Sequence, residues 1–465
     1  MNDPIEPSAA SETAREAAVV IARRLRQHGH VALLAGGCVR DRLRGEEPSD
    51  YDIATDATPA RVSELFRHAK GVGEAFGVML VRRGRHVVEV ATFRSDGTYR
   101  DGRRPESVEF GTPEADARRR DFTINGLFED PESGAIIDFV GGQADLSAGV
   151  IRAIGVPADR FAEDRLRMLR AVRFAARFDH AIDPATRLAI VATPRPLLGV
   201  SRERVGIELR KMLSSPGRAR AVMELEALGL DGDVLDESAS ASGTRGGRAA
   251  PSPSRVAALG PGASFETALV AWLLDRAEGD LSTGATIAAT VSAAELVAAV
   301  AGRAHAVSAA LSLSNAERAL IANILTQFAV VLDVPVETGF DSPVELRSKR
   351  AAGFRGGWST LPVAGRKRSA AEEGFAAALA IVGATHPNRA ATVGREVEAL
   401  AATGLVPPPL VTGDDLVALG FTPGPDFRRI LDAVYDAQLE GRVVNHVEAA
   451  ALARRLTESD SSGRG

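Results

Sequence analysis

The sequence predicts an α+β protein, in which a small mixed domain is followed by a long all-α region. Two patterns predict this order. Strand, helix and hairpin signals alternate up to residue 92, whereas apolar residues recur at three-and-four spacing from about residue 160 onward. Because aromatic residues make up only 5% of the 465 residues, we also expect a core of Ala, Leu and Val, which suits helices.

The composition excludes several classes of protein. Hydrophobic residues at 45% and charged residues at 25% are ordinary for a folded globular chain. The single cysteine, Cys38, excludes an internal disulfide framework and a thiolate zinc cluster. The sequence lacks both a long apolar run and a signal peptide, so we expect no membrane segment and a cytoplasmic location. A net charge of −5 indicates that any nucleic-acid surface is local.

The first hundred residues carry clear capping and turn signals. Thr13 and Glu16 form a capping-box pattern, and Thr58-Pro59 supply an N-cap and a first helical residue. Arg83-Gly84 separates two apolar strand patterns. The expected elements are a helix at 13–29, a strand at 31–35, a short helix at 39–44, a strand at 50–54, a helix at 58–68 and a hairpin of strands at 78–81 and 86–92.

Shifts in composition divide the chain into seven expected segments. Two stretches, one rich in Ser, Gly and Pro and one rich in basic residues, interrupt the helical region. The segments are a flexible N-terminal tail (1–12), an α/β head (13–158), a helical neck (159–236), a flexible insertion (237–264), a helical body (265–346), a basic irregular linker (347–368) and a helical tail (369–465).

The motif GGCVRD is the first candidate for phosphate binding. Gly36 and Gly37 lie between a predicted strand and a predicted helix, where the backbone can approach a phosphate closely and offer free N–H groups. Arg40 adds positive charge. A pair of glycines alone is a weak signal, so this prediction depends on the motif that follows.

Three carboxylates are candidates for metal binding. Asp50 and Asp52 are two residues apart on a predicted strand, so both side chains should project to one face and could hold Mg²⁺. A solvated strand edge is the alternative interpretation of an isolated pair. Glu89 lies in the apolar strand VVEV, where burying a carboxylate is costly without a partner or a metal. Together with the glycine motif, these acids indicate in-line nucleotidyl transfer.

Two arginine-rich motifs could bind a nucleotide. The first, ARRRDFTINGLFED, holds three arginines at 118–120, which could neutralise a triphosphate or form a solvated face. The second contains Asp164, Arg167, Arg170 and Arg173, spaced by three on one predicted helix. A surface salt-bridge ladder is the alternative. A carboxylate beside a guanidinium would match the base edges of cytosine and adenine, and would reject those of uracil and guanine.

Taken in order, these motifs resemble the class II tRNA nucleotidyltransferase and bacterial poly(A) polymerase family. The resemblance covers about residues 31–228, and implies a polymerase-β-like nucleotidyltransferase head with a mixed sheet, followed by all-α neck, body and tail domains that grip RNA. Residues 201–213 are similar to the family's neck helix and residues 411–441 to its tail motif, whereas the match between them is poor. The motifs are GGCVRD, DYDIATDATP, RRRDFTINGL, DFVGGQADL and EDRLRMLRAVRFAARF.

The resemblance also implies roles for individual residues. Residues 94–108 look like the flexible loop that helps the pocket switch from CTP to ATP. The implied magnesium ligands are Asp50 and Asp52, with Glu89 as a third catalytic acid. The candidate nucleotide-binding residues are Gly36, Gly37, Arg40, Arg120, Asp164, Arg167, Arg170 and Arg173.

The function predicted from this resemblance is addition of CCA to the 3′ end of tRNA. The substrates would be CTP and ATP, the cofactor Mg²⁺ and the partner a tRNA 3′ end, with no DNA or membrane. A poly(A) polymerase is the nearest alternative, because the catalytic motifs are shared, and a partial enzyme adding only CC or only A is a variant. A non-catalytic RNA-binding protein is the alternative of another class. The eight scattered histidines include no His-Asp pair, so we expect no phosphohydrolase activity.

Overall fold

The computed structural model describes residues 12–73, 77–96, 108–236, 254–284, 291–334 and 356–461. The chain divides into two compact units, a first unit at Met1–Gly246 and a second unit at Gly247–Gly465, and each is described by itself. Several segments that we predicted to be flexible lie partly outside the described residues, namely 1–11, 97–107, 237–253 and 347–355.

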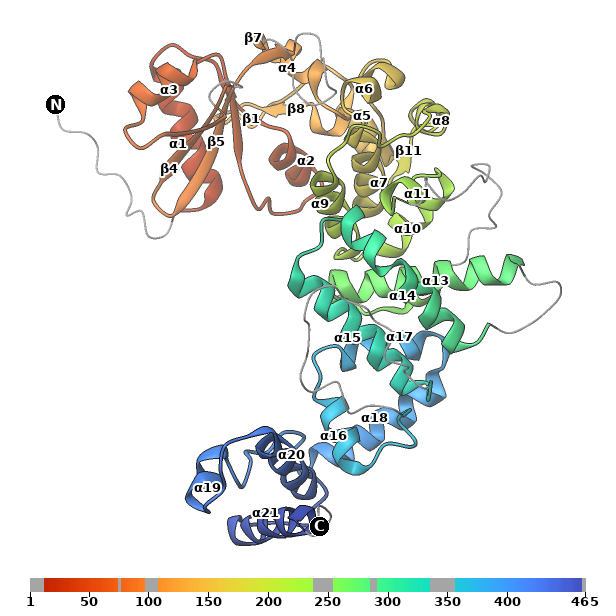
Figure 1. Ribbon diagram of the computed structural model, residues 1–465. Helices are drawn as coiled ribbons and strands as arrows, with labels where there is room; N and C mark the ends of the chain where they lie inside the picture. Colours follow the sequence, from red (N-terminus) through yellow and green to blue (C-terminus); the bar gives the residue numbers. More distant parts are fainter. Residues whose placement is uncertain are drawn as a thin grey trace. The chain divides into compact units, whose positions relative to one another are not determined.

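A seven-stranded mixed sheet forms the centre of the head in the first unit (Figure 1). Its strand order is β3-β4-β5-β2-β1-β8-β9. Strands β2 and β5 pair in parallel, and every other neighbouring pair is antiparallel. The strands are β1 (Ala32–Ala35), β2 (Asp52–Thr55), β3 (Lys70–Gly73), β4 (Val78–Arg83), β5 (His86–Thr92), β8 (Leu127–Glu129) and β9 (Ile136–Asp138).

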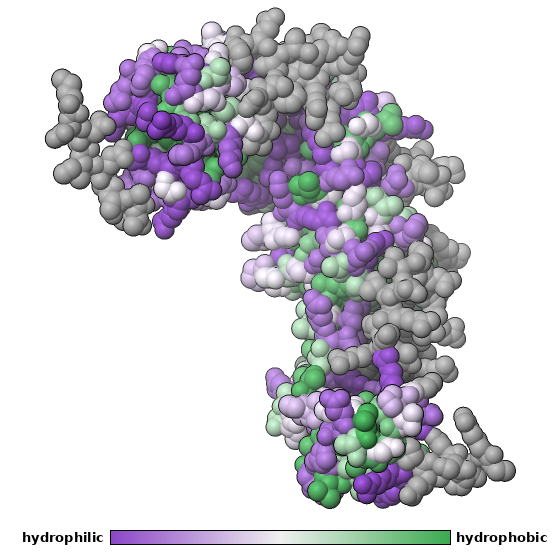
Figure 2. Space-filling view, turned by 60° about the vertical axis from the view of Figure 1, so that its left-hand side comes forward, coloured by the Kyte–Doolittle hydropathy of each residue, from purple (hydrophilic) through white to green (hydrophobic). Residues whose placement is uncertain are grey.

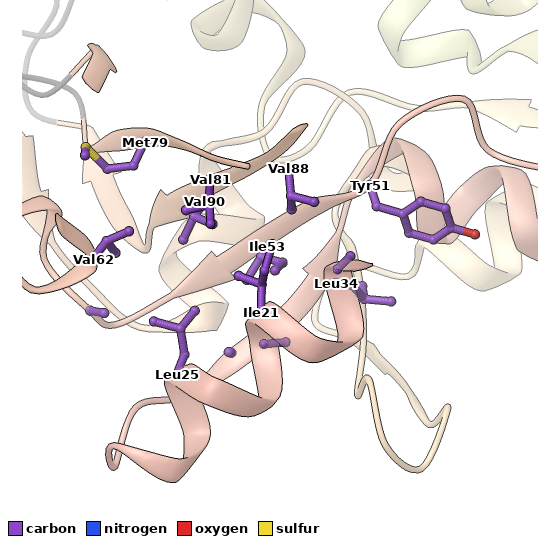
Figure 3. Close-up of a cluster of buried hydrophobic side chains, with 14 of the residues drawn as sticks. Ile21, Leu25, Leu34, Tyr51, Ile53, Val62, Met79, Val81, Val88 and Val90 are labelled. Atoms are coloured by element: carbon purple, nitrogen blue, oxygen red, sulfur yellow. The ribbon is translucent and has the colours of Figure 1, made fainter. Parts of the chain in front are cut away.

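Two helices pack on one face of this sheet. Helix α1 (Ala14–Gln27) contributes Ile21 and Leu25 to a buried cluster, and α3 (Pro59–Leu65) contributes Val62. Figure 3 shows these side chains beside Ile53, Val81, Val88 and Val90 of the strands. Because side chains alternate along a strand, Ile53 faces this core while its neighbour Asp52 faces the opposite side of the sheet.

The caps of the head helices agree with the sequence signals. Thr13 and Glu16 form the predicted capping box of α1, and the Thr58 hydroxyl accepts from the Arg61 N–H at the start of α3. The hairpin of β4 and β5 is also confirmed. Helix α2 (Gly37–Leu43) starts two residues earlier than predicted, and β2 starts at Asp52 rather than at residue 50.

The rest of the first unit is mainly helical. The single helix that we predicted to carry residues 164–173 is interrupted: α6 (Pro157–Glu163) ends before Asp164, and α7 (Leu166–Phe178) begins after Arg165. The remaining elements are β6 (Arg94–Asp96), β7 (Val108–Phe110), α4 (Pro113–Arg119), the 3₁₀ turn η2 (Thr123–Asn125), α5 (Gly142–Ala148), β10 (Val150–Ile151), β11 (Ala181–Ile182), α8 (Pro184–Ala192), α9 (Arg202–Leu213), α10 (Arg218–Ala227) and α11 (Asp231–Val234).

All regular elements described in the second unit are helices, so the predicted α+β class with a mixed sheet and a helical remainder is confirmed. Helices α19 to α21 bury a cluster of their own, around Ile430 and Val434. The helices are α12 (Ser254–Ala258), α13 (Phe265–Gly284), α14 (Ala293–Ala310), α15 (Asn315–Val331), α16 (Val363–Ala370), α17 (Phe375–Thr385), α18 (Pro387–Ala401), α19 (Gly413–Ala418), α20 (Pro425–Leu439) and α21 (His446–Ser461).

Two of these helices correct predictions of irregular chain. Helix α12 lies inside the segment 237–264 that we expected to be a flexible insertion, and its buried Arg255 pairs with Asp275 at 2.8 Å. Helix α16 begins inside the predicted linker 347–368 and ends at Ala370, and the preceding Trp358 is buried. In both places an internal partner or an apolar anchor orders a sequence whose composition resembles a linker.

The face of the first unit that Figure 2 shows is largely polar. Figure 2 shows hydrophilic side chains predominating over the first unit, with apolar side chains interspersed. None of the described helices combines the length and the apolar character that a bilayer-spanning segment needs.

Replacement of Ile53 tests the position of the head core. Ile53 is fully buried, so Ile53→Ala should lower the free energy of unfolding by about 2–5 kcal/mol. Val87 on β5 is 48% exposed, so Val87→Ala should cost less than about 1 kcal/mol. Urea unfolding followed by circular dichroism compares the two, and equal losses would contradict the assignment of this face as the core.

Candidate active site

Two acidic side chains lie next to each other on the face of the sheet opposite α1. Asp52 begins β2 and is paired in register with Glu89 of the parallel strand β5, so both side chains leave the sheet on the same face. Asp50 precedes the strand, and its Oδ2 accepts from the Ser49 hydroxyl at 3.0 Å. Glu89 is exposed rather than buried, so the reason that we gave for its role is wrong. Its position beside Asp52 is what makes it a candidate.

The environment of Asp52 disfavours its charged form. Burial raises the pKa of Asp52 to about 6, and the negative charges of Glu89 and Asp50 act in the same direction, while Arg120 lowers it. A nearby cation would stabilise the charged form of a carboxylate in such an environment. Negative charge is therefore concentrated where β2 and β5 run side by side, and Arg120 offsets only part of it.

The donor set fits a divalent cation that is shared with a substrate. Within the part of the chain that the structure describes, no group of three or more His, Cys, Asp or Glu side chains could enclose a metal ion. The carboxylate oxygens of Asp50 and Asp52 are hard donors of the kind that Mg²⁺ prefers, and Mg²⁺ usually completes its shell with waters and phosphates. The pair therefore suits a phosphate-bridged ion and does not suit an all-protein cage.

The glycine motif brings the backbone close to an arginine. Gly36 precedes α2 with φ of 73°, and a Cβ at this position would lie 2.6 Å from Nη1 of Arg120. The backbone conformation, with φ of 73° and ψ of −120°, favours glycine, and a side chain here would also displace the Arg120 guanidinium. The Gly36 N–H donates to the Leu127 carbonyl at 2.9 Å, so it is not free for a phosphate as we expected. A Cβ at Gly37 would lie 3.6 Å from Nη2 of Arg40.

Arg40 is buried and holds other groups in place. Its Nε donates to Asp41 Oδ1 at 2.7 Å, and its Nη1 donates to the side-chain oxygen of Asn125. Its guanidinium also lies over the rings of Phe174 and Phe178, at 5.4 and 4.7 Å from their centroids. Arg40 thus joins α2 to α7, a role that its position in the motif did not indicate.

Arg120 lies between the glycine motif and the acidic pair. Its Nε and Nη2 donate to Asp116 Oδ2 at 3.2 and 3.0 Å, and its Nη1 donates to the Asn125 carbonyl at 3.1 Å. Its charge also lowers the pKa of Asp52. Of the three consecutive arginines, this one contacts the glycine motif and acts on the carboxylates, whereas Arg118 is exposed and pairs with Glu114.

Asp121 connects two parts of the site and was missed from the sequence. Its Oδ1 accepts from the Asn125 amide at 2.9 Å, and its Oδ2 accepts from Nε of Arg170 at 2.7 Å. Burial alone would raise the pKa of Asp121, but the Arg170 charge and the hydrogen bonds from Asn125, Arg170 and the Phe122 N–H together hold it below its usual value. A single acid directly after three arginines was the available signal.

The predicted base-reading residues do not form one helical stripe. Asp164 lies at the break between α6 and α7, where its Oδ1 accepts from the Leu166 N–H at 3.0 Å and its Oδ2 from Nη2 of Arg204 at 2.7 Å. Arg167 pairs with Glu163 at 2.7 Å rather than with Asp164. At the break, Asp164 has an extended backbone conformation, and its carboxylate accepts from the first N–H of α7.

Arg170 and Arg173 also pair across elements rather than along their helix. Arg170 pairs with Asp121 at 2.6 Å, and Arg173 pairs with Glu208 of α9 at 2.6 Å. The simple surface ladder that we kept as the alternative is therefore wrong for these two arginines. Sequence reasoning missed the acids and the arginine that hold the site together, namely Asp116, Asp121, Glu163, Arg204 and Glu208.

Comparison with known proteins supports the resemblance drawn from the motifs. Residues 32–152 match the family described as the poly A polymerase head domain, and residues 179–237 match the family described as a probable RNA and SrmB binding site of polymerase A. Over 215 residues, the chain is 43% identical to the CCA-adding enzyme of Geobacillus stearothermophilus. This alignment covers 46% of this chain and 53% of that enzyme. Over 209 residues, it is 41% identical to the Bacillus subtilis CCA-adding enzyme, covering 45% and 52%.

A solved structure is similar along nearly the whole chain. The Bacillus stearothermophilus CCA-adding enzyme in complex with CTP matches with a TM-score of 0.66 and 27% identity, covering 97% of this chain and 100% of that chain. In sequence, however, this chain spans only about half the length of the curated relatives that it matches. The resemblance to the tRNA nucleotidyltransferase and poly(A) polymerase family is confirmed, as is the polymerase-β-like head.

Replacement of Asp52 tests the electrostatics of the acidic pair. The pKa of Asp52 is 3.8 in the unfolded chain and about 6 in the folded protein. Between these two pH values the folded protein binds more protons than the unfolded chain, so the free energy of unfolding falls as the pH rises. In chelator, Asp52→Asn should therefore be more stable than the wild type above pH 7, by about 1–3 kcal/mol. The difference should shrink toward pH 4.

Thermal unfolding across this pH range measures the effect, with the exposed Asp50→Asn as a matched control that should change less. A difference between Asp52→Asn and the wild type that does not depend on pH would contradict this account of Asp52.

Proposed function

We propose that this protein, whose head and RNA-binding segments match those of the polymerase family above, adds CCA to the 3′ end of tRNA. The substrates would be CTP and ATP, and pyrophosphate would be released. One observation carries the proposal: the parallel pairing of β2 and β5 sets Asp52 beside Glu89, with Asp50 two residues earlier and the pKa of Asp52 raised to about 6. The similarity of this chain to CCA-adding enzymes supports tRNA as the partner. The location that we propose is the cytoplasm.

In the proposed reaction, the terminal 3′-hydroxyl of the RNA attacks the α-phosphorus of the nucleotide. A new P–O bond forms, the bond to pyrophosphate breaks, and the hydroxyl proton is lost. Mg²⁺ held by Asp50 and Asp52 would supply positive charge for the attacking oxygen and for the leaving pyrophosphate. Asp52 must be ionised for this, which a pKa of about 6 allows at neutral pH. Arg120, which acts electrostatically on Asp52, is placed to attract the triphosphate.

Base selection would depend on Asp164 and Arg167. Cytosine and adenine each present an amino donor beside a ring-nitrogen acceptor, which a carboxylate and a guanidinium match. Uracil and guanine present the reverse order, so their buried polar groups would be left unpaired. Arg204 holds Asp164 at 2.7 Å and Glu163 holds Arg167 at 2.7 Å, so both side chains have fixed neighbours before a nucleotide binds.

A poly(A) polymerase is the second candidate, because the family that matches the head is described by that activity. The two activities differ in their product rather than in the chemistry of one addition. Incorporation of labelled CTP and ATP, with Mg²⁺, onto a tRNA that lacks CCA, or that ends in C or CC, separates them. Addition that stops at a completed CCA supports the proposal, whereas long adenosine tails favour the alternative.

Removal of the acidic pair should abolish incorporation without abolishing RNA binding. With Asp50 and Asp52 both replaced by Ala, incorporation should fall by at least about a hundredfold, since charge stabilisation by a metal contributes several kcal/mol. Asp56→Ala removes an exposed acid just after β2 and is the matched control. If the double variant incorporates nucleotide at the wild-type rate, these carboxylates are not catalytic. If the wild-type protein binds RNA but incorporates no nucleotide, a non-catalytic RNA-binding protein is favoured instead.

Replacement of Asp164 should relax base selection. In Asp164→Ala, the preference in kcat/KM for CTP over UTP should fall at least about tenfold, because the acceptor for the amino group is lost. Steady-state incorporation of each nucleotide measures the ratio, with Asp159→Ala, an exposed acid on α6, as the control. An unchanged ratio would remove Asp164 from base recognition.

A further inference from the structure

One largely buried arginine beside the site has no role in the reaction as described so far. Arg160 lies in α6, and its side chain is only 11% exposed. Its Nη2 donates to the carbonyls of Arg119 and Arg120, the latter at 2.8 Å, and its Nη1 donates to the Glu163 carboxylate. Its contacts therefore link two segments that are about forty residues apart in the sequence.

The first of these segments is the end of α4. Arg119 is the last residue of α4 and Arg120 is its C-cap, so their carbonyls lie at the end of the helix, where backbone acceptors lack partners within the helix. A guanidinium at this end is favourable both for hydrogen bonding and for its interaction with the helix dipole. Arg160 thereby fixes the backbone from which the Arg120 side chain extends toward Gly36.

The second segment carries Arg167. The Glu163 carboxylate that accepts from Arg160 also accepts from Nη1 of Arg167, at 2.7 Å. The same Nη1 donates to the Arg160 carbonyl at 2.9 Å, and Nη2 of Arg167 reaches the Arg119 carbonyl at 3.4 Å. These contacts form a closed ring: Arg167 to Glu163, Glu163 to Arg160, Arg160 to the Arg119 carbonyl, and that carbonyl back to Arg167.

We propose that Arg160 is a positioning residue that locks the base-reading Arg167 to the segment carrying Arg120, so that base selection is coupled to placement of the triphosphate. This inference rests on the proposed function. Without Arg160, Glu163 loses one of its two cationic partners and the Arg119 and Arg120 carbonyls lose a donor. Arg167 would keep its own bonds to Glu163 and to the Arg160 carbonyl, but Glu163 and the Arg119 carbonyl would be held less firmly. The orientation of Arg167 would then be less well defined, and the correct base would lose part of its advantage.

Arg160→Gln tests the coupling, because glutamine keeps a donor of similar shape but cannot reach all three acceptors. We expect the kcat/KM ratio for CTP over UTP to fall at least about tenfold and the KM for CTP to rise. Arg160→Lys keeps the positive charge opposite Glu163, so its kcat/KM ratio for CTP over UTP should lie between those of Arg160→Gln and the wild type. Arg152→Gln is the matched control, since Arg152 also bridges two acids of this unit, Asp145 and Asp183, outside the site.

The outcomes separate positioning from stability. Wild-type discrimination in a folded Arg160→Gln variant, or an equal loss of kcat/KM for CTP and UTP, would overturn the proposal. If Arg160→Gln does not fold, Glu163→Gln breaks the same ring at its shared acceptor and must lower the ratio as well. If the wild-type protein incorporates no nucleotide, the proposed function itself is wrong. If the wild type prefers CTP over UTP and Arg160→Gln has the same preference, only this inference is wrong.

Discussion

The candidate site depends on a largely buried chain of hydrogen-bonded charged and amide side chains that passes through Asp121. From Arg40 it runs through Asn125 and Asp121 to Arg170, and Arg173 pairs with Glu208 beside it. Removing charges from water is costly unless each one is paired and hydrogen-bonded, so the loss of one member would strand its neighbours. This requirement fixes α2, η2, α7 and α9 relative to one another within the first unit, and with them the arginines that a nucleotide would meet.

The acidic pair lies on the face of the sheet opposite the larger apolar core, and a smaller apolar cluster around Ala54 and Phe128 is buried on the same face as the pair. On one face, α1 and α3 cover Ile53 and its neighbours with an apolar core. On the other face, Asp52 lies beside Glu89 with its pKa raised, an arrangement that lowers the stability of the head by itself. A fold that tolerates such a pair holds repelling carboxylates together at a place where a bound cation would relieve the repulsion. The apolar clusters on both faces supply stability that offsets this repulsion.

Local signals in the sequence predicted the head well. The capping box at Thr13, the N-cap at Thr58 and the hairpin around Gly84 are properties of a few adjacent residues, and the structure has all of them. The sequence predicted which residues belong to the candidate site, but it did not predict which of them pair with one another. Asp164 pairs with Arg204 and Arg170 pairs with Asp121, and such tertiary pairs leave no periodic trace in a single sequence. Composition also hid α12 and α16, because a few buried anchors such as Trp358 outweigh a linker-like sequence.

The most direct test of this account is a crystal structure of the full chain with a non-reactive CTP analogue and Mg²⁺. The account predicts density for the ion against Asp50 and Asp52, with the cytosine edge at Asp164 and Arg167 and the triphosphate near Arg120. A nucleotide bound elsewhere, or one whose base does not contact Asp164 and Arg167, would contradict the proposal that these residues select the base. An ion that does not touch Asp52 would contradict the assignment of the acidic pair.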